Sequence, residues 1–263
     1  MAKVLYWGGH GLAVLLLTLL TFVGGIAWAV ALFGTRIHFL FRFALVYVAL
    51  SLALLWVPYL LHQNGVVAVP RISTSFQSSP FLKTPVIYRV LNRDFVRPEL
   101  RGVARDLADH MAQRFPATPR TVTYALDGNF PFFDGLPLLP HLSHDDGDAL
   151  DLALYWQDAN GAYVAGPGKS PMGYWGYADG PSDCPTRPDD LRWDMDWLQP
   201  RLPDLQLDVA RTRKALVWLS QDRRVHKILV EPHILTQIGY DHPKIRFQGC
   251  AAARHDDHIH IQL

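Results

Sequence analysis

Two short segments of the chain combine histidines with carboxylates, the residue types that bind zinc. The first runs from His141 to Asp151, and the second from His255 to His260. A catalytic zinc site has three protein ligands and keeps one position open for water. One histidine and one aspartate from the first segment, with one histidine from the second, would supply these ligands. The composition of the two segments therefore predicts a catalytic zinc site.

The second segment also has the spacing of a strand that presents two imidazoles to one site. Side chains two residues apart on a strand lie on the same face, so His258 and His260 would point together. One would bind the metal, and the other would support a ligand or transfer protons. Taken singly, either segment could instead be a histidine-rich surface turn, and Ser143 with Asp145 could cap a helix. Packing alone gives no reason for three histidines and two aspartates within six residues.

The first segment resembles the signature of a known peptidase family. Ser143-His144-x-x-Gly147-x-Ala149-x-Asp151 is similar to the S-x-H-x-x-G-x-A-x-D motif of the zinc peptidases that group lysostaphin, D-alanyl-D-alanine peptidases and the Hedgehog signalling domain. His258-Ile-His260 is similar to the H-x-H motif of that family, in which the second histidine is the remaining ligand. The resemblance implies one zinc ion held by His144, Asp151 and His260.

Within that family, the run His255-Asp-Asp-His258-x-His260 resembles most closely the penicillin-insensitive murein endopeptidases. The resemblance covers roughly residues 85–263 and implies hydrolysis of the peptide cross-links of bacterial peptidoglycan. The chain departs from the secreted members because it has only two cysteines and a hydrophobic N-terminal segment in place of a cleavable leader. These departures concern the expected substrate more than the expected metal chemistry.

The implied reaction needs a base that takes a proton from the attacking water and later protonates the leaving amine. His258 is the first candidate, because the resemblance places it beside the metal. Asp257 is the alternative, because it precedes His260 by three residues, as the base precedes its ligand in related D,D-dipeptidases. His255 could stabilise the oxyanion or orient His258. His141 is expected to be a solvated turn residue, and the same alternative is open for His255.

The elements that must position these residues follow from hydrophobic periodicity. Leu150, Leu152 and Leu154 share one face of a strand over residues 149–156, which leaves Asp151 on the opposite face. The order of elements predicts an α+β fold, with a small antiparallel sheet and flanking helices. Helices are expected over residues 98–115 and 208–219, and further strands over 121–126, 227–230 and 258–263.

One connection is too long and too unusual in composition to be an ordinary loop. Residues 166–190 are rich in glycine, proline, tyrosine and tryptophan, so they are expected to form a functional loop or an irregular cover over the core. Tyr174, Trp175 and Tyr177 could line the substrate path or only pack. Cys184 and Cys250 could pair in an oxidising compartment or remain free.

The N-terminal part contains two long uncharged runs. Residues 11–34 and 43–61 have no charged side chain, and each approaches the ~20 apolar residues that cross a bilayer. We therefore expect a two-helix transmembrane anchor over residues 1–64, a tether over 65–84 and the zinc peptidase domain over 85–263. A buried helical hairpin is the alternative. Two spans would place both chain ends on one side of the membrane.

Charge adds little to this assignment. The formal net charge of +1 gives no strong field toward nucleic acid, so no nucleic-acid partner is expected. Lys3 and Arg71 balance Arg36 and Arg42 across the expected membrane. Because the expected partner is the peptide stem of peptidoglycan, the domain is expected in the periplasm, anchored to the bacterial inner membrane. The alternatives are a D-Ala carboxypeptidase or dipeptidase, and a noncatalytic zinc module that binds the wall.

Overall fold

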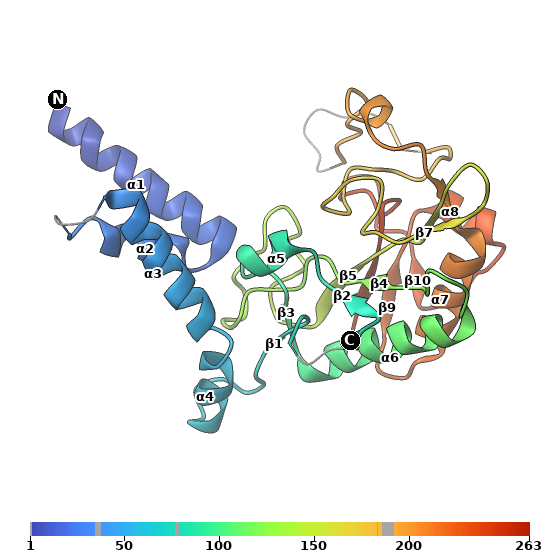
Figure 1. Cartoon of the computed structure of the whole chain (residues 1–263), viewed down its shortest axis with the longest axis horizontal. Helices are drawn as coiled ribbons and strands as arrows, with labels where there is room; N and C mark the ends of the chain where they lie inside the picture. Colours follow the sequence, from blue (N-terminus) through green and yellow to red (C-terminus); the bar gives the residue numbers. More distant parts are fainter. Residues whose placement is uncertain (1, 35–37, 77–78, 183, 186–191) are drawn as a thin grey trace.

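The computed structural model describes residues 2–263 except residues 35–37, 77–78, 183 and 186–191. Figure 1 shows a group of N-terminal helices beside a larger part that contains helices and short strands, so the α+β class expected from the sequence is confirmed. The helices are α1 (Ala2–Thr21), α2 (Gly24–Ala31), α3 (Phe39–Ala53), α4 (Val57–Gln63), α5 (Val86–Val90), α6 (Pro98–Arg114), α7 (Val209–Gln221) and α8 (Pro232–Ile238), with a 3-10 turn at Gln199–Arg201. The strands are β1 (Ile72–Ser73), β2 (Leu82–Lys83), β3 (Phe95–Val96), β4 (Thr123–Tyr124), β5 (Ala149–Ala153), β6 (Trp156–Gln157), β7 (Tyr163–Val164), β8 (Gln206–Leu207), β9 (Lys227–Leu229), β10 (Ile245–Arg246) and β11 (His258–Gln262).

The central sheet has four strands in the order β10-β9-β11-β5. Strand β11 is antiparallel to both neighbours, and its register places His260 opposite Asp151. Strand β10 is parallel to β9, so the sheet is mixed and the expectation of an antiparallel sheet is corrected. The reason is the crossover through α8, which carries the chain back so that β10 runs in the direction of β9.

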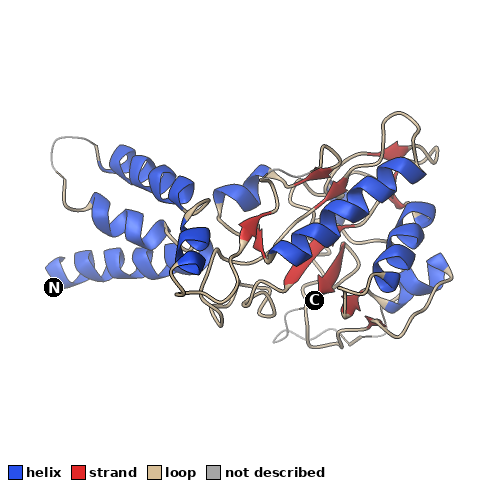
Figure 2. Cartoon of the chain, turned by 90° about the horizontal axis from the view of Figure 1, so that it is seen from below, coloured by secondary structure: helices blue, strands red, loops and turns tan. Residues whose placement is uncertain are grey.

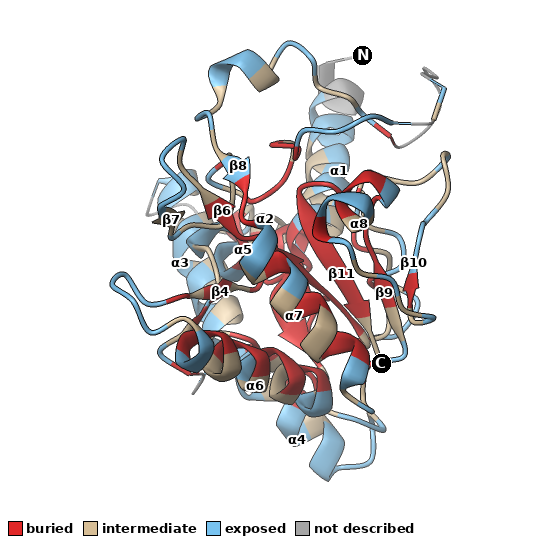
Figure 3. Ribbon diagram, turned by 90° about the vertical axis from the view of Figure 1, so that its right-hand side faces the viewer, coloured by how far each residue is buried: buried red, intermediate tan, exposed pale blue. Residues whose placement is uncertain are grey.

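One face of this sheet packs on helices α6 and α7 and forms the main core (Figure 3). The core includes Leu150 and Leu152 of β5 and Ile261 of β11, all of them buried. Burial of each such side chain contributes roughly 1.5–3 kcal/mol to stability. Because side chains alternate along a strand, Asp151 and His260 are turned to the opposite face. The hydrophobic core thus fixes the face on which the polar residues gather.

The predicted helices are confirmed, whereas two predicted strands are shorter than expected. Helix α7 begins after Asp208, whose carboxylate accepts a hydrogen bond from the backbone nitrogen of Arg211 at 2.9 Å. The strand expected over residues 121–126 is only β4, which pairs with β2. The strand expected over 149–156 ends at Ala153, because β6 leaves the central sheet and pairs with β7 and β8.

The first hydrophobic run is two antiparallel helices rather than the single one expected. The chain reverses at Phe22, whose φ is +68°, and α2 then packs along α1. Nε1 of Trp28 donates to Nδ1 of His10 at 3.1 Å, which fixes the antiparallel pairing. The close approach depends on Gly25, because a Cβ there would lie 2.0 Å from Oγ1 of Thr18. Figure 1 shows the N-terminus at the end of α1 away from the part that contains the strands.

The membrane anchor expected over residues 1–64 is only partly supported by helix length. Among the described residues, no single helix has both the length and the apolar composition of a membrane span. Helices α3 and α4 together reach that length and composition, with a bend of 44° between them. Figure 2 shows these N-terminal helices projecting from the part that contains the strands.

The segment expected as a tether is largely part of the domain. Strand β1 pairs with β3, and β2 pairs with β4. Arg71 is buried, and its guanidinium donates to the carbonyl oxygen of Phe130 at 2.8 Å. These contacts leave only the residues between α4 and Arg71 as a connection.

The N-terminal helices contact the domain directly. Phe22 packs on Phe130 with ring centroids 5.6 Å apart. Nδ2 of Asn92, which is buried, donates to the carbonyl oxygen of Thr21 at 3.2 Å and to Oγ of Ser51 at 3.1 Å. One side chain of the domain thus holds the ends of α1 and α3 together. The junction between helices and domain is packed rather than a free linker.

Cys184 and Cys250 form a disulfide, which was one of the two alternatives left open by the sequence. The bond joins residues 66 positions apart. It connects the long segment after β7 to the segment just before His255.

Candidate metal centre

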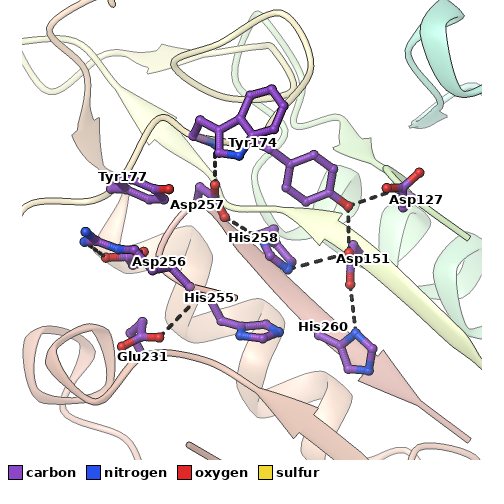
Figure 4. A network of polar contacts seen from close by, with 12 residues as sticks. Asp127, Asp151, Tyr174, Tyr177, Glu231, His255, Asp256, Asp257, His258 and His260 are labelled. Carbon is purple, nitrogen blue, oxygen red and sulfur yellow. Dashed lines mark hydrogen bonds and ion pairs between the residues drawn. The ribbon is translucent and has the colours of Figure 1, made fainter. Parts of the chain in front are cut away.

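Asp151 lies at the centre of the polar face of the sheet, as Figure 4 shows. Its Oδ1 lies 2.9 Å from Nδ1 of His260 and 3.2 Å from Nε2 of His144. The two nitrogens are 3.1 Å apart, and all three side chains are buried. The three residues predicted as ligands therefore converge, with one nitrogen or oxygen atom of each at nearly equal distances from the others.

The orientation of His144 directs one ring nitrogen at this triangle of atoms. Nδ1 of His144 donates to the carbonyl oxygen of Gly128 at 2.6 Å, so Nε2 is the nitrogen that faces Asp151 and His260. Burial disfavours the charged ring, but Asp151 outweighs it and raises the pKa of His144, so the group attracts positive charge. Two nitrogen ligands at zinc–ligand distances of ~2.0–2.1 Å in a tetrahedral site lie roughly 3.3 Å apart. The triangle therefore fits a cation, and the bond to Gly128 is the support that metal-binding histidines usually have.

The other oxygen of Asp151 faces residues that the sequence did not assign. Tyr174 donates its hydroxyl to Oδ2 at 2.6 Å, and Nδ1 of His141 lies 3.3 Å from the same oxygen. The His141 side chain is 11% exposed, so the expectation of a solvated turn residue is corrected. His141, His144 and Asp151 form a group that could hold a metal ion. Asp151 is thus contacted by imidazoles from both sides.

A buried ion pair supports His141 from the interior. Oδ2 of Asp127 lies 3.1 Å from Nδ1 of His141. Nε and an Nη of Arg93 each donate to one oxygen of Asp127 at 2.7 Å, and both side chains are buried. Burial disfavours the ionised carboxyl, but Arg93 and His141 outweigh it and lower the pKa of Asp127. Asp127 therefore presents a negative charge to His141.

His258 lies on the same face of β11 as His260, as their spacing predicted. Its Nε2 is 3.6 Å from Oδ2 of Asp151, and its Nδ1 hydrogen-bonds to Oδ1 of Asp257. Burial favours the neutral ring, but Asp151 and Asp257 outweigh it and raise the pKa of His258 to about 9 in the metal-free protein. The ring is thus a proton carrier directly beside the group of ligand atoms.

Asp257 faces His258 rather than the candidate ligands. One carboxylate oxygen bonds to the ring of His258, and the other accepts a hydrogen bond from the backbone nitrogen of Trp175 at 2.5 Å. Because both oxygens are engaged, the carboxylate fixes the ring orientation of His258. This geometry supports an orienting role for Asp257 over the alternative role as base.

His255 is buried, which contradicts the alternative of a solvated turn residue. Its ring centroid lies 4.7 Å from that of His258 and 5.9 Å from that of His260. The backbone nitrogen of His255 donates to Glu231 at 3.2 Å, and Glu231 is paired with Arg192. Burial, with the charge of His258, lowers the pKa of His255 well below its usual value. A neutral imidazole therefore borders the candidate site.

Gly147 of the predicted motif has a structural reason to be glycine. Its φ is +90°, and a Cβ there would lie 2.8 Å from Nε of Arg71. The backbone nitrogen of Gly147 donates to Oδ1 of Asn129 at 3.1 Å. This turn sets the chain path between His144 and β5.

Two cavities share His141 and His258 in their linings, and only the first of them is also lined by the three predicted ligands. The first has a volume of about 500 Å³ and is lined by His144, Asp151 and His260 among others. The second has a volume of about 180 Å³ and a mainly apolar lining. Its aromatic side chains are Tyr88, Tyr174, Trp175, Tyr177 and Trp193.

Sequence reasoning missed Asp127 and Arg93 and assigned no role to His141. Asp127 is 24 residues before Asp151 and belongs to no motif, so its partner could not be inferred from spacing. His141 stands three residues before His144, which was a usable signal. Tyr174 was considered only as a residue of the substrate path or of packing, yet its hydroxyl is bonded to Asp151.

The sequence matches no model of a known protein family, and it matches no curated protein. A function for this chain therefore depends on the geometry of the candidate site.

Proposed function

We propose that this chain is a zinc-dependent peptidase that cuts peptide cross-links in bacterial peptidoglycan. The observation that carries the proposal is the convergence of Nε2 of His144, Oδ1 of Asp151 and Nδ1 of His260 within 2.9–3.2 Å of one another. Three buried ligand atoms, one from the loop before β5, one from β5 and one from β11, are what a catalytic zinc site needs. The sequence motifs support the same three residues.

His141 is the competing ligand, because it also approaches Asp151. We assign it a supporting role, since its Nδ1 lies on the Oδ2 side of Asp151, closer to Asp127 than to Asp151. His260 lies on the Oδ1 side, where His144 also points. Zinc is favoured over harder cations because two of the three proposed ligands are imidazoles.

A bound zinc ion would supply a water of lowered pKa and would polarise the scissile carbonyl. Beside a bound cation the ring of His258 would lose its proton more readily than in the metal-free protein. The neutral ring would then accept the proton of that water and return it to the leaving amine, because its Nε2 points toward Asp151 and its Nδ1 is held by Asp257. The neutral ring of His255 would donate a hydrogen bond to the developing oxyanion. Tyr174 would keep the carboxylate of Asp151 in place.

The shape of the site favours a cross-link over a terminal residue. The cavity lined by the candidate ligands shares His141 and His258 with the aromatic cavity, so a substrate in the first cavity would have a second space beside it. A carboxypeptidase or dipeptidase would need a closed end instead. The disulfide and the apolar N-terminal helices fit an oxidising periplasm and attachment to the inner membrane.

The test combines metal analysis with digestion of purified murein by the detergent-solubilised full chain. We expect one zinc per chain and cleaved cross-links, identified by the masses of the released peptides. The His260→Ala variant should lose the metal and all activity, whereas the surface control His226→Ala should keep both. Stoichiometric zinc in His260→Ala would contradict the ligand set. Release of only D-Ala would move the proposal to the carboxypeptidase, and zinc binding without hydrolysis would leave a wall-binding module.

A further inference from the structure

The N-terminal helices reverse direction twice before the chain enters the domain. Trp28 of α2 pairs with His10 of α1, and the rings of Trp28 and Phe39 lie 4.7 Å apart at the start of α3. The helices α1, α2 and α3 are therefore successively antiparallel. An odd number of passes places the N-terminus and the domain at opposite ends of this unit, as Figure 1 shows.

The outer surface of this helical unit is apolar. Helix α3 buries none of its side chains. Exposed aliphatic side chains are found on all three helices, among them Leu12, Leu16, Ile26, Leu45, Val48 and Leu52. Such a surface is stable when lipid rather than water covers it.

The described lysine and arginine of the unit lie at one end. The first 70 residues contain no aspartate or glutamate, and their lysine and arginine residues are Lys3, Arg36 and Arg42. Lys3 is in the first turn of α1, and Arg42 is in the first turn of α3, both at the end away from the domain. Arg36 lies between α2 and α3 in the sequence, outside the described residues. Basic residues flanking membrane helices stay preferentially on the cytoplasmic side.

We infer that helices α1, α2 and α3 form a membrane-embedded unit of three antiparallel helical passes, with the N-terminus in the cytoplasm and the domain on the periplasmic face. The inference rests on the membrane attachment proposed above and replaces the two-span arrangement, in which both ends lie outside. It also changes how charge bears on the orientation. Because α1 and α2 are separate helices, Lys3 and Arg42 lie at the same end of the unit instead of on opposite sides of a membrane.

The lengths of the passes fit a unit on which the domain is seated. Helix α1 has 20 residues and is about 30 Å long, and its apolar part is Tyr6–Thr21. Helix α2 has 8 residues and covers only about 12 Å, so it is a half-length pass packed between the other two. Exposed Val90 and Phe133 of the domain adjoin this unit, since the carbonyl of Val90 accepts from Tyr47 and the Phe133 ring lies 6.1 Å from that of Phe22. The domain therefore meets the bilayer surface with apolar side chains.

The test labels single cysteines in the full chain with a membrane-impermeant maleimide, before and after detergent is added to spheroplasts. The two native cysteines are joined in a disulfide and do not react. Ala159→Cys lies in an exposed turn of the domain, Ala2→Cys at the start of α1 and Phe33→Cys after α2. We expect Ala159→Cys to be labelled without detergent, and Ala2→Cys and Phe33→Cys only with it.

Each alternative arrangement in the membrane predicts a different set of cysteines labelled without detergent. Labelling of both Ala159→Cys and Ala2→Cys without detergent would restore the two-span arrangement and overturn the inference. Labelling of Ala2→Cys alone would invert the orientation, and recovery of the chain in the soluble fraction would remove the membrane. None of these results depends on zinc or hydrolysis, so failure of the topology and failure of the proposed activity are distinguished.

Discussion

The N-terminal helices and the domain place their charged and apolar side chains in opposite ways. The domain buries charges, and Arg93 with Asp127 is held inside by paired hydrogen bonds. The helical unit has no acidic residue and exposes leucines such as Leu45 and Leu52. The difference fits the proposal that the domain lies in water and the helical unit in lipid. In water a buried charge needs a buried partner, and in lipid an exposed leucine needs none.

The largest effect is expected from the proton carrier of the domain. His258→Ala should lower the turnover of murein by about 10²–10⁴, because a positioned proton-transfer group typically contributes that much. Zinc content should stay near one per chain, since His258 is not a proposed ligand. Turnover and bound zinc are measured on the same preparation. Turnover equal to that of the wild type would move the base to Asp257.

The buried ion pair should dominate the stability of the domain. Arg93→Met leaves the carboxylate of Asp127 without its partner, so the free energy of unfolding should fall by about 3–5 kcal/mol. Urea denaturation followed by tryptophan fluorescence measures it. The double variant Arg93→Met with Asp127→Leu should recover much of the loss, because it removes the unpaired charge. A single variant as stable as the wild type would show that the domain does not depend on this pair.

The stability of the helical unit should instead depend on close packing between α1 and α2. Gly25→Val places a side chain where Oγ1 of Thr18 already lies, so overpacking should cost about 1–3 kcal/mol. Gly11→Val is the matched control, because no atom lies within 4 Å of a Cβ at Gly11. Unfolding of the helical signal in detergent compares the two variants. Equal stability would mean that α1 and α2 do not pack closely.

The smallest effect is expected from a polar contact within the helical unit. Trp28→Phe removes the hydrogen bond to His10 but keeps an aromatic ring near Phe39. Hydrogen bonds between membrane helices contribute on average about 0.6 kcal/mol, so the loss should be of that order. The same detergent assay measures it. A loss as large as that of Arg93→Met would remove the contrast between the two parts.

The sequence predicted best what depends on local periodicity. Alternation along β5 and β11 placed Asp151, His258 and His260 on one face, because that face is opposite the buried leucines and isoleucines. The α+β class and the two long helices followed from the same kind of pattern.

The contacts that the sequence missed are long-range. Nothing in the spacing joins Asp127 to His141, because their approach depends on how two loops fold over the sheet. The chain reversal at Phe22 could not be predicted for a different reason. A hydrophobic run has the same composition whether it forms one helix or two, and the close packing of Gly25 against α1 shows that it forms two.

The disulfide between Cys184 and Cys250 links the shape of the site to the compartment in which the chain matures. Ala251, Ala252 and Ala253 directly follow Cys250 and line the cavity that contains the candidate ligands. In a reducing cytosol the bond would not form, and this side of the cavity would lack its covalent attachment to the segment that contains Cys184. If the domain is exported as proposed, the order of maturation would be translocation, oxidation and completion of the cavity. The proposed peptidase would then lack this covalent link until it reaches the periplasm.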